Sequence, residues 1–559
     1  MSQNLKISLQ KHIRRYALLI FVVYLFTAIF LYRPILKSLF VSDDFDWVAR
    51  AKNTTLVLEN LFLRNAEGTR DSGVYRPITV LSFWPNYQAS GLNSFGYHLV
   101  NVFLHFGSAF LLFWLVWQLT GRNNCWLAFL VGLFFLIFPN HPEAVSWISG
   151  RNDVLAVFFF LLSFNLYVLF RIGGRYLWLG VSSLAFALAI FSKEMAASLP
   201  IILLAYELVW QKSALWKKKI SFILPLATIL GLYILLRQFA TGLLFSSYSN
   251  IQSSFSIFSA INIFIRSLIS HFISPAQIWI TNGLASHWFL FILLLMCAAW
   301  LGWRFCQEKK LYLFSILFFI IALGPVYNLQ LSGFTSEGER FVYLPSIGMA
   351  MLLAVIVAGL WKKWRILGII TAMVLIVYFS FNLWQRNLIW QNAGALSQQL
   401  LADFASETNL KPGEGAVIMG LPDNIGGAYV FRNGWITALK LFYPTYLVDV
   451  LPTKALLNLS KNNYNKKVID WTVLPNGYRA SAISSQHLFT GSAKLDSLDY
   501  LLNIKNYDTI VKAGNEAEFH FTPIFIAQLS SKTINFLVFN EGRLKKIDPI
   551  ISVYKENSN

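Results

Sequence analysis

The chain has 559 residues, of which 56% are hydrophobic and 16% aromatic, and its mean hydropathy is +0.54. A water-soluble fold of this size cannot bury so much apolar surface, so the composition excludes a soluble globular protein and indicates a membrane protein that crosses the bilayer many times. The net charge of +19 does not indicate a nucleic-acid partner, because the basic excess lies in the apolar part: residues 1–390 hold 30 Lys and Arg against 13 Asp and Glu, whereas residues 391–559 hold 16 against 14.

Apolar runs of about the length needed to cross a bilayer recur throughout residues 1–390, and each predicts a membrane-spanning helix. We expect eleven such helices, at residues 16–36, 97–119, 126–139, 153–170, 176–191, 195–210, 220–237, 287–303, 311–327, 345–361 and 366–384. The connecting segments on one side of the bilayer carry most of the Lys and Arg residues. By the positive-inside rule, these segments and the N-terminus lie in the cytoplasm.

One apolar segment, residues 256–284, does not fit this alternation. Both of its ends must be external if the charge pattern is kept. We therefore interpret it as an amphipathic helix that re-enters the membrane or lies at its surface, interrupted at Pro275. The alternative is a further span, which would reverse the orientation of every later helix and disagree with the distribution of Lys and Arg.

The sequence changes character after residue 390. Runs such as "GAVIMGLPDN" and "TINFLVFNEGRLKKI" combine strand-forming residues with turn residues, and the second favours a hairpin at its "GRL". Residues 391–559 therefore predict a small α/β or mostly-β domain, which the odd number of spans places outside the cytoplasm. The predicted fold is an all-α polytopic membrane domain at residues 1–390, with a first external loop at 37–96, followed by this extracytoplasmic domain. In a bacterium the chain would lie in the plasma (inner) membrane.

The predicted topology places most of the non-cytoplasmic charged residues at the outer ends of the helices. Charge close to the membrane is costly and is commonly functional. Cations there can hold a phosphate, and a carboxylate can accept a proton from a hydroxyl within hydrogen-bond reach. The polar residues of these loops include Asp43, Asp44, Asp46, Arg76, His141, Glu143, Arg151, Asp153, Lys193, Glu194, Glu339, Arg340 and Tyr343.

Structural roles are an alternative for each of these groups. The aspartates of "SDDFD" (42–46) could cap a helix at the membrane exit. Three sets of near neighbours could form local ion pairs: Arg151 with Asp153, Lys193 with Glu194, and Glu339 with Arg340. A polar stripe on one face of the second predicted span favours interhelical hydrogen bonds over chemistry, and it consists of His98, Asn101 and His105.

Five motifs carry a resemblance to a known family. They are "SDD" after the first span, "YRPITVLSFWPNYQASGLNSFGYHLVNVFLH", "FPNHPEAVSWISGRNDVLA", "FSKEMAASLP" and "GERFVYLPSIG", in this order. Together they make residues 1–390 resemble the GT-C superfamily of integral-membrane glycosyltransferases. Within it, the chain is most similar to the protein O-mannosyltransferases of the transmembrane and tetratricopeptide-repeat type and to their bacterial relatives. The repeats do not follow in this sequence, so the acceptor of those relatives is not carried over.

The resemblance implies a transferase that takes a monosaccharide from a polyprenyl-phosphate donor. The acidic pair of the family corresponds to Asp43 and Asp44, one of which would be the catalytic base. We prefer Asp43, with Asp44 shaping the site. The donor phosphate would contact Arg76, Arg151, Lys193 and Arg340. The sugar or acceptor would lie near His141, Glu143, Asp153, Glu194, Glu339 and Tyr343.

A lipid phosphate is a good leaving group, so a base and cations suffice, and a single displacement would invert the anomeric carbon. We expect no required cofactor, although Asp44 and Asp46 are weak candidates for a divalent cation. The acceptor could be a protein, a glycan or a lipid, membrane lipids would surround the helices, and nucleic acid is not an expected partner. Alternative functions are a transporter or flippase, a polymerase or ligase of lipid-linked glycans, and a membrane-anchored binding protein.

Overall fold

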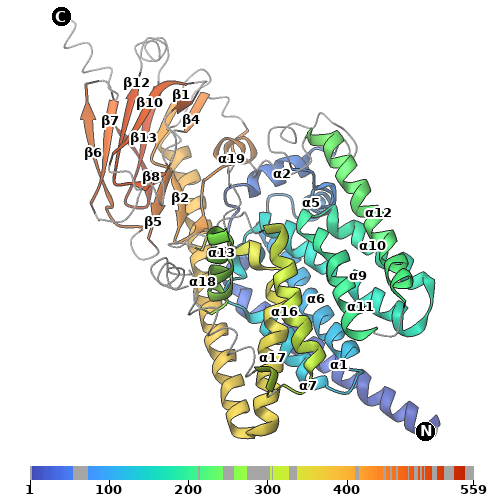
Figure 1. The fold of residues 1–559 in the computed structure, drawn as a ribbon. Helices are drawn as coiled ribbons and strands as arrows, with labels where there is room; N and C mark the ends of the chain where they lie inside the picture. The colour runs from blue at the N-terminus through green and yellow to red at the C-terminus, as the bar shows by residue number, and fades with distance from the viewer. Residues whose placement is uncertain are drawn as a thin grey trace, which may run out of the picture. The chain divides into compact units, whose positions relative to one another are not determined.

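The structure of the chain is a computed structural model (Figure 1), which covers residues 3–54, 74–211, 215–242, 257–272, 302–304, 306–326, 336–408, 415–444, 449–452, 456–460, 464–475, 477–483, 489–490, 494–495, 498–505, 513–521 and 534–547. Two compact units make up the chain. The first, which we call the helical unit, comprises Met1–Leu36 and Arg50–Asn387. The second, the C-terminal unit, comprises Lys37–Ala49 and Leu388–Asn559.

The helical unit is built from apolar helices. In the described part of the chain these are α1 (Gln3–Tyr32), α5 (Pro77–Ser90), α6 (Ser94–Leu119), α7 (Cys125–Ile137), α9 (Arg151–Gly173), α10 (Tyr176–Ile190), α11 (Leu199–Trp210), α12 (Trp216–Thr241), α13 (Ile257–Ser270), α16 (Lys309–Leu323), α17 (Ser346–Lys363) and the first part of α18 (Arg365–Thr408). Short helical turns between them are η1 (Arg33–Lys37), α8 (Pro142–Val145), η2 (Ile148–Gly150), η3 (Glu194–Ser198), η5 (Gly324–Val326) and η6 (Glu339–Val342).

These helices confirm the predicted class of a polytopic helical membrane protein. Among the described residues, seven helices are long and apolar enough to cross a membrane. Each predicted span overlaps a helix, except 287–303, which lies almost wholly outside the described residues. The helices α7, α10 and α11 have 13, 15 and 12 residues, fewer than the roughly 20 of a full span. The orientation of the termini stays a prediction.

The predicted interfacial segment 256–284 begins with the helix α13. Its remainder from residue 273, including Pro275, lies outside the described residues. Whether this segment re-enters the membrane or spans it therefore stays a prediction.

Glycine permits a close approach of three helices in the helical unit. Helix α7 packs against α6 and α17, and also against α1. A Cβ atom at Gly132 of α7 would meet the Tyr24 hydroxyl of α1 and, at 2.7 Å, the carbonyl oxygen of Ala109 in α6. Tyr24 in turn donates a hydrogen bond of 2.6 Å to the carbonyl oxygen of Phe129. The packing of α1, α6 and α7 thus depends on the missing side chain at Gly132.

Among its described residues, the C-terminal unit contains three small sheets. In the first, with order β14-β13-β1-β4, β1 (Gly415–Met419) pairs in parallel with β13 (Ile534–Asn540) and β4 (Asp449–Pro452), while β14 (Arg543–Ile547) is antiparallel. The other two sheets have the orders β11-β8-β5-β2-β3 and β6-β7-β12-β10-β9. Their strands are β2 (Pro422–Ile425), β3 (Ala428–Tyr429), β5 (Leu456–Leu459), β6 (Ile469–Leu474), β7 (Gly477–Ala482), β8 (Phe489–Thr490), β9 (Lys494–Leu495), β10 (Leu498–Lys505), β11 (Ala513–Gly514) and β12 (Glu516–Phe521).

The predicted small α/β or mostly-β domain is thereby confirmed. The described helices of this unit are α19 (Trp435–Phe442), the second part of α18 and the first part of α2 (Asp44–Lys52). The predicted hairpin joins β13 to β14. Glu541 and Gly542, between the strands, have φ angles of 53° and 76°, as a two-residue type I′ turn requires.

The units differ from those expected from the sequence in one place. Residues 37–49, expected in the first external loop of the membrane domain, belong to the C-terminal unit. Their apolar side chains explain this, because Phe45 is fully buried and stacks on Phe431 with ring centroids 5.7 Å apart. The expected boundary at residue 390 lies three residues from the observed one at Asn387, and both fall inside α18, which continues to Thr408. The loop 37–96 also contains the helices α2 (Asp44–Lys52) and α5.

We expect G132A to destabilise the protein by about 1–3 kcal/mol, because the added methyl group cannot fit between α1 and α6. A matched control is G180A, because a Cβ atom at Gly180 of α10 meets nothing within 4 Å. That variant should unfold at or slightly above the wild-type temperature, since Ala favours helix over Gly. Thermal unfolding of the detergent-solubilised proteins measures both effects. A G132A protein as stable as G180A would contradict the close packing at Gly132.

Candidate functional site

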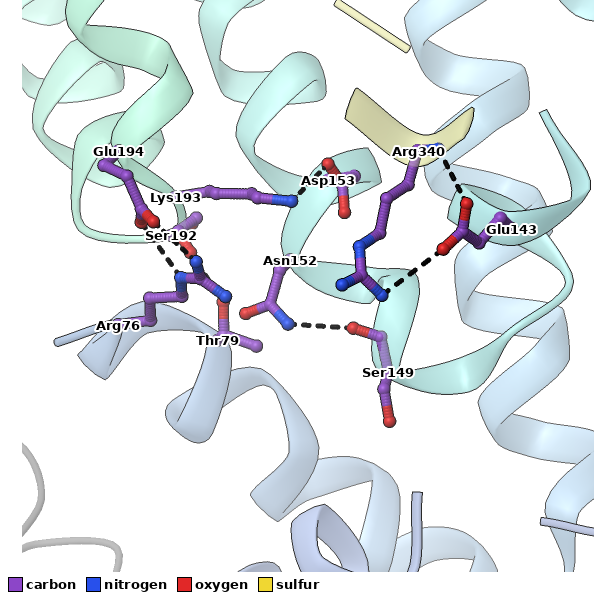
Figure 2. A network of polar contacts seen from close by, with 10 residues as sticks. All are labelled: Arg76, Thr79, Glu143, Ser149, Asn152, Asp153, Ser192, Lys193, Glu194 and Arg340. Carbon is purple, nitrogen blue, oxygen red and sulfur yellow. Dashed lines mark hydrogen bonds and ion pairs between the residues drawn. The ribbon is translucent and has the colours of Figure 1, made fainter. Parts of the chain in front are cut away.

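Two ion pairs connect the segment between α10 and α11 to other helices (Figure 2). Arg76, just before α5, contacts Glu194 twice: Nη2 lies 2.6 Å from Oε1, and Nε lies 3.0 Å from Oε2. Lys193 Nζ lies 2.6 Å from Oδ1 of Asp153, in the first turn of α9. Lys193 has an extended backbone, with φ −159° and ψ 139°. Its side chain and that of Glu194 therefore diverge and reach different partners.

Two further pairs involve η6. The backbone N–H of Arg340 donates to Glu143 Oε2 at 3.0 Å, and its Nη1 lies 3.5 Å from Oε1. The Arg340 guanidinium also lies over the ring of Trp147, 4.8 Å from its centroid. Neighbouring Glu339 pairs with Arg386 of α18, with Oε2 2.7 Å from Nη2. These four pairs join residues distant in sequence. We define the ion-pair network as the first three: Arg76–Glu194, Lys193–Asp153 and Arg340–Glu143.

The ion-pair network is largely buried, which shifts the pKa values within it. The side chains of Asp153 and Lys193 are only 1% and 7% exposed. Burial lowers the pKa of Lys193 from its ordinary value of 10.5, against the opposing effect of Asp153, and the charges of Arg76 and Arg340 lower it further. Burial alone would raise the pKa of Glu194, but Arg76 and Lys193 hold it down to about 2. Arg76 and Arg340 therefore both lie close enough to Lys193 to act on its charge.

Asn152 lies next to Asp153 at the start of α9. Its Nδ2 donates to the carbonyl oxygen of Ser149 at 2.8 Å, which fixes the orientation of the amide, because a carbonyl oxygen only accepts. Asn152 is 5% exposed, and its Oδ1 has no hydrogen-bond partner among the described residues. An unpaired buried acceptor costs about 1–3 kcal/mol, so this oxygen is a position that a ligand can stabilise.

Arg151, a predicted phosphate ligand, is fully buried at the start of α9. Its guanidinium carbon Cζ lies over the ring of Phe83, 4.1 Å from the ring centroid. Its guanidinium donates to neutral oxygen atoms of α5 and α6: Asn86 Oδ1 (2.8 Å), Asn101 Oδ1 (2.9 Å), Tyr97 O (3.0 Å) and Ser82 O (3.3 Å). These hydrogen bonds join α9, where Arg151 lies, to α5 and α6. This geometry favours a structural role for Arg151 over the predicted contact with phosphate.

The polar stripe on α6 forms contacts with other elements. Asn101 Nδ2 donates to carbonyl oxygens within residues 145–148. His105 Nε2 donates to a carbonyl oxygen of α7 at 3.1 Å, so its Nδ1 accepts from the Tyr343 hydroxyl at 2.7 Å. His98 is buried on the same helix, at 3% exposure. These bonds are of the interhelical kind that the spacing of the stripe indicates.

His141, predicted near the sugar or acceptor, is fully buried. Its Nε2 lies 2.9 Å from Ser346 Oγ, which itself donates to the carbonyl oxygen of Tyr343, so the imidazole is the donor. Burial holds the pKa of His141 well below its ordinary value of 6.5, and His105 and His271 lower it further. His141 is therefore neutral, and its bond to Ser346 connects the segment before α8 to α17.

The predicted catalytic acids lie in the C-terminal unit. Asp44 begins α2 and is 1% exposed, and its Oδ2 accepts from a backbone N–H three residues earlier at 3.0 Å. Asp43 is half-buried, and its Oδ1 accepts from Asn433 Nδ2 at 2.8 Å. Asp46 Oδ1 accepts from Thr437 Oγ1 at 2.5 Å. The three acids therefore have separate partners, and Asp43 is more accessible than Asp44.

Metal binding gains no support from the surroundings of Asp44 and Asp46. Within the part of the chain that the structure describes, no three or more His, Cys, Asp or Glu side chains come together as metal ligands would. The two aspartates stay weak candidates for a divalent cation.

Two residues of the site were missed by sequence reasoning. Arg386 follows the last predicted span, on the predicted outer side, where the positive-inside rule makes a cation unusual, and that was an available signal. Asn152 gave no such signal, because its importance rests on an oxygen that is buried and unpaired only in the folded chain.

We expect E194Q to destabilise the protein by about 1–3 kcal/mol, because Arg76 is only 10% exposed and loses its charged partner. The pKa of Glu194 lies below its ordinary value of 4.5, so the pair stabilises the fold fully above about pH 5 and loses this effect as the pH falls from 4.5 towards 2. Thermal unfolding of the wild type and E194Q should therefore differ most near neutral pH and converge in acid. A difference that stays constant down to about pH 3 would count against this pairing.

We also expect R151K to destabilise the protein by about 2–4 kcal/mol, because an ammonium group cannot reproduce the planar donor set of the guanidinium. R122K is the matched control, since Arg122 is exposed after α6. Thermal unfolding in detergent compares the two variants. Equal stability of R151K and R122K would show that Arg151 has no structural role.

Comparison with known proteins identifies several protein O-mannosyl-transferases as relatives, although no family model matches the chain. The chain is 24% identical over 361 residues to the protein O-mannosyl-transferase F38B6.6 of Caenorhabditis elegans, covering 59% of this chain and 50% of that protein. It is 25% identical over 488 residues to the human protein O-mannosyl-transferase TMTC3, covering 76% and 51%. The chain thus spans about half the length of these curated relatives, which confirm the resemblance that the motifs indicate. Among solved structures, it is similar to an oligosaccharyltransferase of Archaeoglobus fulgidus, with 10% identity, a TM-score of 0.41, and coverage of 72% of this chain and 60% of that one.

Proposed function

We propose that the chain is a glycosyltransferase that moves a monosaccharide from a polyprenyl-phosphate donor to an acceptor hydroxyl on the outer face of the membrane. The observation that carries this proposal is the similarity, over 361 and 488 residues, to proteins named protein O-mannosyl-transferases. Those names make a mannosyl donor and a protein acceptor the first to test. A glycan or a lipid is the alternative acceptor.

In the proposed reaction, the acceptor oxygen attacks the anomeric carbon while the bond from that carbon to the phosphate oxygen breaks. The acceptor proton passes to a carboxylate, and polyprenyl phosphate leaves with the bonding electron pair. We assign the base to Asp43, because the carboxylate of Asp44 is buried and already accepts a backbone N–H. The single displacement inverts the configuration of the sugar.

We assign the stabilisation of the departing phosphate to Arg76, Lys193 and Arg340. Their side chains are 10%, 7% and 18% exposed, so they act where water screens charge poorly. Cations fixed in such a place stabilise the negative charge that develops on a leaving group. Because the protein supplies these charges, the proposed reaction requires no metal ion.

We expect D43N to lower kcat by about 10²- to 10⁴-fold, the usual contribution of a positioned general base. The assay incubates the full chain in lipid nanodiscs with polyprenyl-phosphate mannose and a hydroxyl acceptor, and follows the release of free polyprenyl phosphate. D470N is the matched control, because Asp470 lies in the same unit and its side chain is 56% exposed. This variant should keep wild-type turnover.

The outcomes of this assay distinguish a wrong assignment of the base from a wrong proposed function. If D43N and D44N both keep wild-type turnover, neither Asp43 nor Asp44 is the base, although the proposed transferase activity still holds. No turnover by the wild type with any polyprenyl-phosphate sugar would overturn the proposed function. It would favour a transporter or flippase, or a polymerase or ligase, of lipid-linked glycans.

A further inference from the structure

The unpaired oxygen of Asn152 lies among the charges of the ion-pair network. Figure 2 shows Asn152 in the middle of the drawn residues, with Arg76 and Lys193 on one side and Ser149 and Arg340 on the other. The bond from Nδ2 to the carbonyl oxygen of Ser149, 2.8 Å long, fixes the amide. Oδ1 consequently faces away from Ser149, buried and without a partner among the described residues.

The chemistry around this oxygen defines the ligand that would satisfy it. A neutral amide oxygen accepts a hydrogen bond, so the matching ligand group is a donor such as a hydroxyl. The neighbouring cations match an anion, and a neutral acceptor does not repel that anion as a further carboxylate would. One molecule that carries both groups a few bonds apart is a glycosyl phosphate, whose sugar hydroxyls lie close to the anomeric phosphate.

We propose that Asn152 determines donor specificity by accepting a hydrogen bond from one hydroxyl of the donor sugar. This inference rests on the proposed function and adds to it a residue that distinguishes donors. A site built to bond a hydroxyl rejects the analogue that lacks it, because its own buried polar group is then left unpaired. Asn152 therefore selects a hydroxyl-bearing sugar over its deoxy analogue.

The test compares polyprenyl-phosphate mannose with its mono-deoxy analogues, each lacking one hydroxyl, in nanodiscs containing the full chain. For the wild type we expect one deoxy donor to react with a kcat/KM at least about tenfold below that of the parent. In N152L and N152A this ratio should fall to about one, chiefly through slower reaction of the parent donor. The ratio is measured within each variant, so it does not depend on how much of the protein is folded.

The matched control is N382L. Asn382 of α18 also donates its Nδ2 to a carbonyl oxygen, that of Tyr378 at 2.8 Å, but on an exposed surface. N382L should keep the wild-type ratio. The inference is overturned if the wild type uses every mono-deoxy donor as well as the parent, or if N152L and N152A keep the wild-type ratio. Absence of turnover by the wild type with all donors would instead overturn the proposed function itself.

Discussion

The pairing of Lys193 with Asp153 is the contact on which the charged end of the helical unit depends. The two side chains are 7% and 1% exposed, so burying either charge without its partner would be costly. The pair fixes the segment between α10 and α11 against the first turn of α9. One residue further, Glu194 attaches the same segment to Arg76 and so to the start of α5. Loss of either ion at Lys193–Asp153 would leave an uncompensated charge at the junction of three helices.

A buried ion pair adds little to the stability of a fold, because apolar residues of similar size in its place often give an equally stable protein. Preorganisation gives a better reason for the ion-pair network. A cation stabilises a developing charge best when it is already in place, and a carboxylate on its other side holds it there before a ligand arrives. Glu143, Asp153 and Glu194 each do this for one cation. In the proposed reaction, the acids beside these cations are then needed to hold the cations in place, and the carboxylates need not touch a substrate.

The sequence predicted the helices well and the pairs poorly, for a physical reason. Apolar length identifies a membrane helix locally, so α6, α9 and α17 were placed to within a few residues. Ion pairs depend on which loops meet. Lys193 shows this, because it pairs with Asp153, 40 residues away, while its neighbour Glu194 pairs with Arg76. Consecutive side chains on an extended backbone diverge, so adjacency in sequence argues against contact.

The same limit applies to the unit that holds the predicted base. The motifs that resemble known transferases lie within residues 1–390, but the surroundings of Asp43 come from beyond residue 390. Ser42 N donates to the carbonyl oxygen of Val430 at 2.7 Å, and Asn433 donates to Asp43 itself.

Gly434 makes this contact possible. It has a φ angle of 80°, and a Cβ atom there would collide with the carbonyl oxygen of Ser42. The segment after residue 430 therefore fixes the backbone that presents Asp43. The "SDD" motif that contributes to the resemblance therefore folds within the C-terminal unit, against a segment 390 residues further along the chain. If Asp43 is the proposed base, changes in this segment would act on the reaction through the position of its carboxylate.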